Sequence, residues 1–212
     1  VLEFRDREGP QFAEDPALSP GVRFGFPDWL IRRWSAQFGA ETPQLLASLN
    51  ERPQKMARIT QSGERDRILS ELQERGISAE PCSYHPDYLI PASWQDLLQD
   101  PLFLEGKLLA QDVSAVFPVL MIARDNPGSV ADVCTAPGGK LSALWQYCPP
   151  GIPVDGYDRS EKRLQVCEEN LQRLGIRDIP LRVADAASFP FPEYSHILID
   201  APCSGFGVIR KR

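Results

Sequence analysis

The most informative segment of the chain is Ser129-Val-Ala-Asp-Val-Cys-Thr-Ala-Pro-Gly-Gly-Lys140. Val130 and Val133 suit a buried strand, and the pair Gly138-Gly139 indicates a turn where the backbone can approach a ligand closely. We expect a helix from Lys140 to residue 147, whose first turn would direct free N–H groups and a positive dipole end toward that ligand. The segment therefore predicts a strand, a tight loop and a helix start of the kind that binds nucleotides, although the dinucleotide fingerprint G-x-G-x-x-G is absent.

Four hydrophobic segments each carry an aspartate at or near their carboxyl end. These segments are residues 130–133 with Asp132, 153–157 with Asp158, 181–184 with Asp185, and 196–199 with Asp200. Their alternation with helical patterns predicts a parallel, doubly wound α/β sheet, in which ligands bind at the carboxyl ends of the strands. Asp158 follows Gly139 by 19 residues, a spacing that suits a carboxylate accepting ribose hydroxyls. Taken singly, each aspartate is also typical of a helix N-cap.

Several motifs occur in a recognisable order between residues 107 and 212. They are Gln111-Asp-Val-Ser114, Asp132-Val-Cys-Thr-Ala-Pro-Gly-Gly-Lys140, Asp158 with Arg163, Asp185, and Asp200-Ala-Pro-Cys-Ser-Gly-Phe-Gly-Val-Ile-Arg210. This order resembles the RNA 5-methylcytosine methyltransferases of the RsmB/Nop/NSUN family. Upstream, Pro27-Asp-Trp-Leu30 with Arg33-Trp34 resembles the bacterial ribosomal RNA members. The departures from the family pattern are Thr135 for alanine, Leu141 for threonine and Thr60 for asparagine.

The resemblance implies a cofactor, a substrate and a set of site residues. The cofactor is S-adenosylmethionine, and the substrate is RNA, with ribosomal RNA the expected target. The cofactor-binding residues implied are Cys134, Thr135, Ala136, Pro137, Gly138, Gly139, Lys140, Asp158, Arg163, Asp185 and Asp200. The catalytic residues implied are Cys203, Asp200 and Lys140, of which Asp200 and Lys140 would bind the polar edge of the cytosine.

Cytosine carbon 5 needs activation, because it is a poor nucleophile. A thiolate that adds to carbon 6 makes carbon 5 nucleophilic, so a cysteine beside the base is required. Chemistry alone favours Cys203, which lies three residues after Asp200. The family resemblance instead makes Cys203 the group that assists product release, with the attacking cysteine in a Thr-Cys-Ser motif on a later strand. We therefore expect the chain to be a fragment whose nucleophile lies beyond Arg212.

The predicted organisation has four parts. Residues 1–18 form a tail or linker, residues 19–51 a helical segment, residues 52–106 a small α/β subdomain similar to an RNA-recognition fold, and residues 107–212 the N-terminal part of a Rossmann-like methyltransferase domain. In the second part, helices are expected from Asp28 and from Thr42. In the last, Ser160 should cap a helix that buries Leu164 and Cys167.

Composition restricts the class of protein further. The sequence has no run of 18 apolar residues and no signal-peptide pattern, so we expect a cytoplasmic protein without membrane contact. Five cysteines without a Cys-x-x-Cys pair, and only two histidines, disfavour a disulfide framework and a metal site. A monomer is expected.

The net charge of −6 makes general nucleic-acid binding unfavourable, since residues 1–106 hold 11 basic against 17 acidic residues. RNA binding would then depend on local basic clusters. The clusters are Arg32/Arg33, Arg52/Lys55/Arg58 and Arg210/Lys211/Arg212. Each is equally typical of a solvated surface.

Two alternatives remain open at this stage. A methyltransferase that acts on another atom, such as an amine nitrogen, usually has Asp/Asn-Pro-Pro-Tyr where this chain has Asp200-Ala-Pro-Cys203. A catalytically silent RNA-binding or assembly protein could keep the methyltransferase fold. A cysteine in the downstream motif would distinguish the active enzyme from the silent protein.

Overall fold

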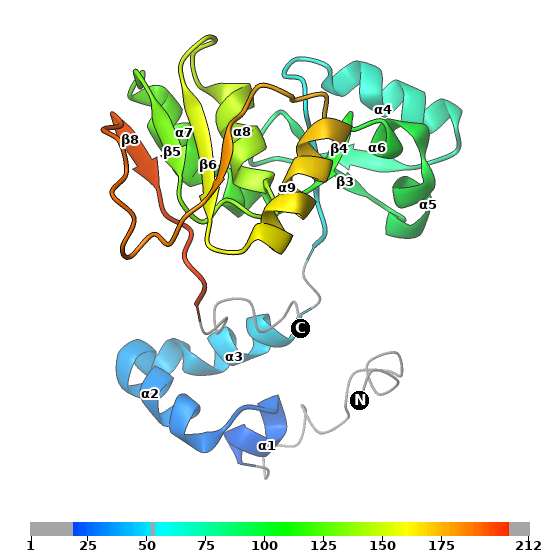
Figure 1. Cartoon of the computed structure of the whole chain (residues 1–212). Helices are drawn as coiled ribbons and strands as arrows, with labels where there is room; N and C mark the ends of the chain where they lie inside the picture. Colours follow the sequence, from blue (N-terminus) through cyan, green and yellow to red (C-terminus); the bar gives the residue numbers. More distant parts are fainter. Residues whose placement is uncertain (1–18, 52–53, 204–212) are drawn as a thin grey trace. The chain divides into compact units, whose positions relative to one another are not determined.

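The structure is a computed structural model that describes residues 19–51 and 54–203. It divides into two compact units (Figure 1), one containing the described residues 19–51 and the other residues 54–203. The larger unit contains two separate four-stranded sheets, one antiparallel and one parallel. No helix in these described ranges is long and apolar enough to cross a bilayer.

The first unit is helical. It consists of α1 (Pro20–Phe24), α2 (Asp28–Phe38), the 3-10 turn η3 (Gly39–Glu41) and α3 (Thr42–Asn50). Both predicted helices are present, but Pro27 rather than Asp28 occupies the N-cap of α2, so the Asp28 carboxylate lies in the first turn near the positive end of the dipole. Phe26, Leu30, Ile31 and Leu46 form its small core.

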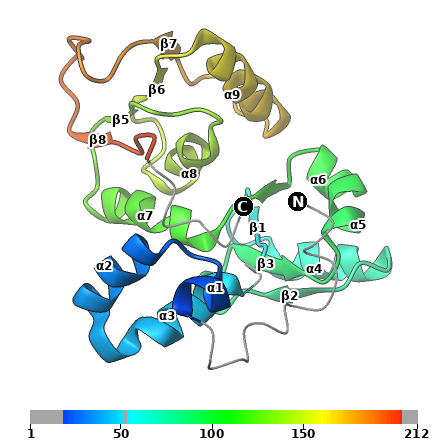
Figure 2. The same ribbon diagram turned by 90° about the horizontal axis from the view of Figure 1, so that it is seen from below.

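The antiparallel sheet has the order β2-β3-β1-β4. Its strands are β1 (Ala57–Ile59), β2 (Ala79–Pro81), β3 (Tyr88–Pro91) and β4 (Leu108–Ala110), and its helices are α4 (Arg65–Glu74), α5 (Trp94–Gln99) and α6 (Pro101–Leu104). Figure 2 shows β1, β2 and β3 beside α4, α5 and α6. Ile59, Ile68, Leu72 and Leu97 form a core between the sheet and the helices. Strand β4 pairs with β1 although it lies beyond residue 106, so the sheet extends past the point where the sequence pattern suggests a boundary.

The parallel sheet has the order β7-β6-β5-β8. Its strands are β5 (Val130–Asp132), β6 (Val154–Asp158), β7 (Leu181–Val183) and β8 (His196–Leu198), and they occupy the four predicted segments. The 3-10 turn η4 (Val113–Ala115) and helix α7 (Phe117–Arg124) precede β5, while α8 (Gly139–Tyr147) and α9 (Glu161–Arg173) connect the strands. Pro118 does not bend a continuous helix, because it lies in the first turn of α7, where its missing N–H costs nothing. The predicted α/β class is confirmed.

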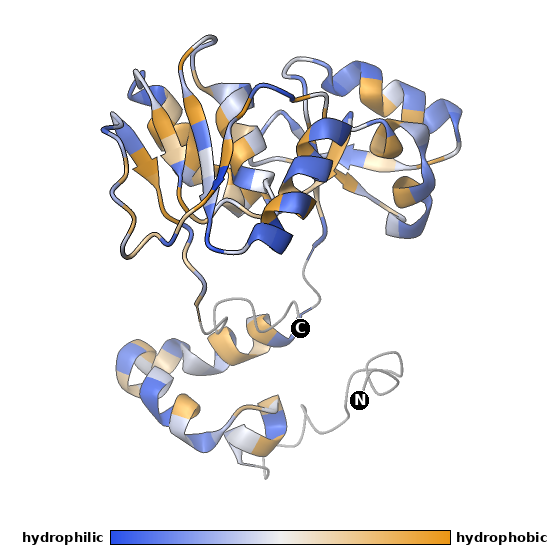
Figure 3. Cartoon of the chain, in the orientation of Figure 1, coloured by the Kyte–Doolittle hydropathy of each residue, from blue (hydrophilic) through white to orange (hydrophobic). Residues whose placement is uncertain are grey.

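The two faces of the parallel sheet are covered differently. Helices α7, α8 and α9 pack on the face of Val130 and Val154, and Cys167 of α9 is fully buried there, as predicted. Ser160 caps α9 through its hydroxyl, and the viewed outer face of this helix is mostly hydrophilic (Figure 3). The opposite face carries Ala131 and Tyr157, which pack against Phe191 and Tyr194 from the segment after β7.

A serine joins the amino-terminal ends of β5 and β8. Ser195 Oγ accepts the N–H groups of Gly128 and Ser129, both at 3.0 Å, and donates to the carbonyl of Ser129 at 2.6 Å. The adjacent His196 pairs with Asp125 at 2.9 Å. Ser195 Oγ also lies 3.2 Å from His196 Nδ1, but its shorter contact is with the Ser129 carbonyl, so this group holds the two strands together.

Candidate active site

The loop between β5 and α8 is held in a tight conformation by its own backbone. Gly138 has a φ of 98°, which favours glycine, and its N–H donates to the carbonyl of Thr135 at 2.8 Å. The Thr135 N–H in turn donates to the carbonyl of Tyr157 at the end of β6 at 2.9 Å. Helix α8 begins at Gly139, so the sequence prediction of strand, loop and helix start is confirmed.

One face of α9 supports this loop from behind. Arg163 Nη2 donates to the carbonyl of Ala136 at 2.6 Å, and Asn170 Nδ2 donates to the carbonyl of Pro137 at 2.9 Å. Cys167 lies between these two residues on the same helical face. Asn170 was absent from the predicted site, and its partner 33 residues away gives no local signal.

Asp158, the last residue of β6, connects this strand to the β5–α8 loop by hydrogen bonds. Its side chain is only 2% exposed, and its two oxygens accept the N–H groups of Ala136 at 3.3 Å and Ser160 at 3.0 Å. Arg163 completes the group with an ion pair of 3.2 Å. Asp158 and Arg163 are therefore brought to the loop together, and both are already engaged in holding it.

A small cavity of about 110 Å³ opens in front of the loop. Its lining residues come from the loop, from β5, from the start of α8 and from two flanking segments: Gln111, Asp132, Cys134, Thr135, Ala136, Pro137, Gly139, Lys140 and Asp200. Lys140 Nζ forms an ion pair with Asp200 Oδ2 at its edge. The structure thus brings together the predicted residues from position 134 to 140 and Asp200, across 60 positions of sequence.

Five predicted site residues do not line this cavity. Gly138, Asp158 and Arg163 shape the loop from behind, whereas Asp185 and Cys203 take no part in it. Asp185 is exposed and its carboxylate accepts the N–H of Ala187 at 3.0 Å, which forms a local turn after β7. Cys203 is exposed at the end of the described range. Their roles stay predictions.

Two lining residues were not predicted as site residues. Asp132 is buried beneath the loop, and this burial raises the pKa of its carboxyl group to about 6. Gln111 is oriented by Tyr88 of β3, whose hydroxyl donates to Gln111 Oε1 at 2.9 Å. The position of Asp132 at the end of a predicted strand could have identified it as a site residue. The Tyr88 contact was not predictable, since it joins β3 to the residue after β4, 23 positions away.

The chemistry of the cavity is set by its buried polar groups. Thr135 Oγ1 is buried beside the Asp132 carboxylate and the Cys167 thiol, and no contact among the described residues gives it full hydrogen-bond geometry. Part of its hydrogen-bonding capacity is therefore left for a ligand. Burial and the neighbouring carboxylates of Asp132 and Asp158 raise the pKa of the Cys134 thiol. Cys134 therefore stays protonated at neutral pH and is a poor nucleophile.

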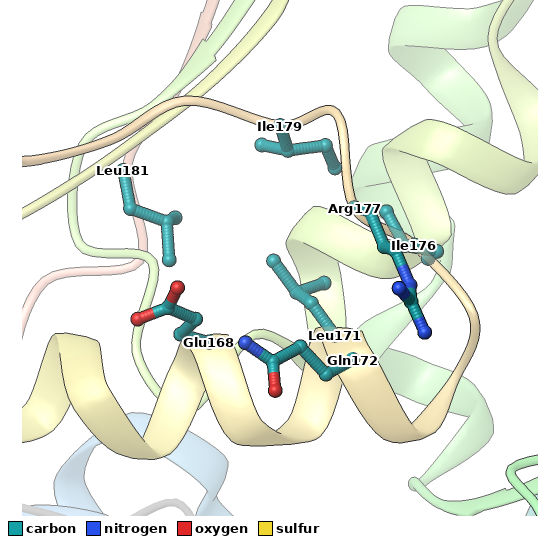
Figure 4. Close-up of a pocket in the computed structure, with 7 residues that line it drawn as sticks. All are labelled: Glu168, Leu171, Gln172, Ile176, Arg177, Ile179 and Leu181. Carbon is teal, nitrogen blue, oxygen red and sulfur yellow. The ribbon is translucent and has the colours of Figure 1, made fainter.

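A larger cavity of about 450 Å³ lies elsewhere, between α9 and the segment that leads into β7 (Figure 4). Its floor is apolar, with Leu171, Ile179 and Leu181, and Glu168 and Arg177 stand at its rim. It adjoins the amino-terminal end of β7, whereas ligands of parallel sheets bind at the carboxyl ends. We therefore place the candidate site in the smaller cavity. Within the described ranges, histidine, cysteine and acidic side chains form no group of three that could hold a metal.

The structure corrects one predicted RNA-binding cluster. Arg58 is fully buried, so it is not available to phosphate, while Lys55 is exposed. Arg32 and Arg33 are exposed on α2, so they are accessible to an RNA phosphate or to solvent. Arg52 and residues 210–212 lie outside the described residues.

Two family models match this chain. Residues 119–212 match the 16S rRNA methyltransferase RsmB/F model, and residues 26–98 match the ferredoxin-like domain of RsmF/B-like methyltransferases. The chain belongs to the RsmB/F methyltransferase family. This confirms the resemblance seen in the sequence motifs.

Curated relatives of the family align along the whole chain. Ribosomal RNA small subunit methyltransferase B of Pseudomonas syringae pv. tomato is 32% identical over 100% of this chain and 48% of its own length. The protein of that name from Citrobacter koseri is 33% identical, over 90% of this chain and 45% of its own length. This RsmB/F chain thus spans about half the length of the curated relatives it matches.

Solved structures confirm the fold. A methyltransferase homologue from Pyrococcus horikoshii has a TM-score of 0.76 at 23% identity, covering 92% of this chain and 67% of that one. The structure titled NSun6 from Pyrococcus horikoshii with SFG has a TM-score of 0.72 at 16% identity, covering 84% and 71%. At these identities the likeness extends to the fold alone.

Proposed function

We propose that this chain is part of an S-adenosylmethionine-dependent methyltransferase that methylates carbon 5 of a cytosine in ribosomal RNA. The observation that carries the proposal is the Lys140–Asp200 ion pair at the edge of the cavity formed by the glycine loop. The family membership and the names of the curated relatives support the same reaction class and the same kind of substrate.

The residues around the loop fit S-adenosylmethionine. This group would supply a methyl group on a positively charged sulfur. Gly138 and Gly139 would leave the backbone open to it, Thr135 Oγ1 would gain a hydrogen bond of full geometry, and Asp132 would place a negative charge near the sulfonium. Asp158 and Arg163 would hold the loop in shape, and any ribose contact would use the remaining lone pairs of Asp158.

Lys140 and Asp200 are suited to the polar edge of cytosine. A carboxylate accepts from the exocyclic amine or a protonated ring nitrogen, and an ammonium donates to the carbonyl oxygen. Asp200 has 58% of its side chain exposed and Lys140 has 22%, so both groups are accessible from solvent. Lys140 also lies in the first turn of α8, which keeps its Cα fixed relative to the loop.

Cys203 fits product release better than Cys134 fits attack. Cys134 is held as a thiol by its surroundings, and Cys203 follows the Asp200-Ala-Pro sequence that resembles the family's release motif. In this proposal a second cysteine, in the downstream motif of the full-length protein, attacks carbon 6. Cys203 then assists the elimination that frees the methylated base.

The experiment uses the full-length protein with ribosomal RNA that lacks the modification. Wild type should incorporate one methyl group at carbon 5 of cytosine, detected by mass spectrometry of the digested nucleosides. Cys203→Ala should attack the RNA but fail to release it, leaving a protein–RNA adduct that survives denaturing electrophoresis.

Replacing the downstream cysteine should abolish that adduct, and Cys134→Ala serves as the matched control that should still turn over. If Cys203→Ala forms no adduct while the downstream variant does, the two roles are reversed. If the wild type modifies no cytosine and binds no donor, the chain belongs to a silent member of the family.

A further inference from the structure

Arg58 is a buried cation in the middle of the antiparallel sheet. It belongs to β1, its exposure is 0%, and its side chain leaves that sheet to reach α8. Nη2 donates to Ser142 Oγ at 2.6 Å and to the carbonyl of Gly139 at 3.4 Å, and Nη1 donates to Gln146 Oε1 at 2.9 Å. All three partners lie more than 80 positions away in the sequence.

Two of these contacts fall on the first turn of the helix that begins in the glycine loop, and the third falls on Gln146 near its C-terminal end. Lys140 lies between Gly139 and Ser142, the two residues that Nη2 contacts. Gln146 completes the link, because its Nε2 donates back to the carbonyl of Ile59 in β1 at 3.0 Å. Strand β1 and α8 are therefore joined at both ends of the helix.

The energetics suit a positioning role better than a purely stabilising one. Burial lowers the pKa of Arg58, since the charged form loses its hydration, and Arg58 Nε has no hydrogen-bond partner among the described residues. Apolar side chains often fill such a space at no loss of stability. What they cannot supply is a planar fork of donors that fixes a backbone carbonyl and a hydroxyl at the same time.

A second contact runs from the same sheet to the same cavity. Tyr88, which pairs with Arg58 across β1 and β3, donates its hydroxyl to Gln111 Oε1, and Gln111 lines the cavity. Asp87 beside it is buried and accepts from Ser62 Oγ at 2.6 Å and from the hydroxyl of Tyr147 in α8 at 3.0 Å. The antiparallel sheet thus reaches the cavity through Tyr88 and Gln111, and it holds the C-terminal end of α8 through Asp87.

We propose that Arg58 is a positioning residue for the candidate active site, and that it fixes the first turn of α8 so that Lys140 is directed toward Asp200. The role of the antiparallel subdomain then includes completing the donor site of the neighbouring sheet. This inference rests on the proposed function, because it assumes that the cavity binds S-adenosylmethionine.

The test compares Arg58→Lys with Arg173→Lys in the full-length protein. Arg173 is the matched control, because it also connects the two sheets: its Nη1 donates to the carbonyls of Phe103 at 2.5 Å and Leu108 at 3.3 Å, away from the loop. Lysine keeps the charge but cannot form the fork. Calorimetry with S-adenosylmethionine should give a Kd about tenfold higher for Arg58→Lys, or about 1.4 kcal/mol, and an unchanged Kd for Arg173→Lys.

The methylation rate gives the second readout. Arg58→Lys should lower kcat as well as raise KM, because a displaced Lys140 no longer contacts the cytosine correctly in the transition state. The thermal unfolding midpoints of Arg58→Lys and Arg173→Lys should stay close to each other. Ser142→Ala provides a milder change if Arg58→Lys does not fold. It removes one hydrogen bond of Arg58, keeps a good helix former, and should raise the Kd roughly threefold, or about 0.7 kcal/mol.

Each result bears on the inference. Equal changes in Kd for the Arg58 and Arg173 variants, or an unchanged Kd for both Arg58→Lys and Ser142→Ala, would show that Arg58 serves general stability only. A wild-type protein that binds no S-adenosylmethionine would overturn the proposed function and this inference with it. A wild type that binds normally while the Arg58 variants also bind normally overturns the inference alone.

Discussion

Gly138 in the loop faces the sulfur of Cys167 in α9 so closely that a β-carbon on Gly138 would lie 2.9 Å from Sγ. The backbone at this glycine also has a φ of 98°. Two independent constraints, one of torsion and one of space, therefore apply at the point where the loop turns into α8.

Gly138→Ala should destabilise the protein by about 2–4 kcal/mol, of which roughly 1–2 kcal/mol comes from the left-handed backbone and the rest from overpacking. Urea unfolding gives this difference. Gly151→Ala is the control, because Gly151 has a φ of 84° and no atom near the position of a β-carbon. If both variants lose the same stability, the contact with Cys167 is not limiting.

Asp158→Ala should reduce both stability and donor affinity. Removing the carboxylate leaves the Ala136 and Ser160 N–H groups without their acceptor. We expect a loss of about 2 kcal/mol in unfolding free energy, kept modest because Arg163 is half-exposed and its ion pair is screened. Binding of S-adenosylmethionine should weaken by about 2 kcal/mol.

Asp155→Ala is the matched control for that variant. Asp155 belongs to the same strand, forms an ion pair with Arg182 at 3.1 Å and accepts the hydroxyl of Tyr194, but it lies away from the loop. Its replacement should lower the unfolding free energy and leave calorimetric affinity unchanged. Comparable losses of affinity in both variants would assign the effect to the sheet as a whole.

Asp132 should make stability depend on pH in an unusual direction. Burial raises its pKa to about 6 from an ordinary value of 3.8, so the ionised form is disfavoured in the folded state. The destabilisation is fully present above pH 6 and disappears as the pH falls toward 4. Asp132→Asn should therefore be more stable than wild type at pH 7, by up to about 3 kcal/mol, and equally stable near pH 4.

Donor binding should follow the opposite trend. The carboxylate attracts the positive sulfonium, so wild-type affinity should fall as the pH drops through 6, whereas Asp132→Asn should bind weakly and with little change across that range. Calorimetry at pH 5 and pH 7.5 would measure both. An affinity in wild type that stays constant across this interval would remove Asp132 from the donor site.

RNA binding should depend on exposed arginines of α2 and not on Arg58. Reversing the charge at Arg32 and Arg33 should lower the slope of log K against log salt by about 0.7–0.9 for each RNA phosphate that these side chains neutralise in the wild type. Arg58→Gln, which removes the charge, should leave the slope unchanged, since the residue is buried. A slope unaltered by the double reversal would assign Arg32 and Arg33 to solvent.

The parts of the fold with local signals were predictable from sequence. Helix α9 has a serine cap at Ser160, apolar residues at helical spacing and Gly175 with a φ of 75° after its end. The four parallel strands are short apolar segments bounded by turns and acids. Strand β2 was not predictable, because Pro81 argues against a strand. Strand β4 lies beyond the predicted boundary at residue 106 and was not predicted.

The candidate site divides in the same way. The loop from residue 134 to 140 and Asp200 could be predicted, because each belongs to a continuous sequence motif. Arg58 was misassigned, since a basic residue is usually exposed and the partners that bury this one are up to 88 positions distant. Gln111 and Asn170 carry hydrogen bonds whose partners are 23 and 33 positions away, and no pattern in one sequence reports such distances.

The serine that joins the starts of β5 and β8 also determines what happens at their other ends. Strand β8 is paired with β5 from Val130↔His196 to Asp132↔Leu198, and Asp200 follows two positions later. A shift of pairing by one residue would move Asp200 by about 3.3 Å and turn its side chain to the opposite face of the sheet. Ser195 therefore sets the register of β8 against β5 at the amino-terminal ends of the two strands. That register determines that the Asp200 carboxylate, beyond the other end of β8, meets Lys140.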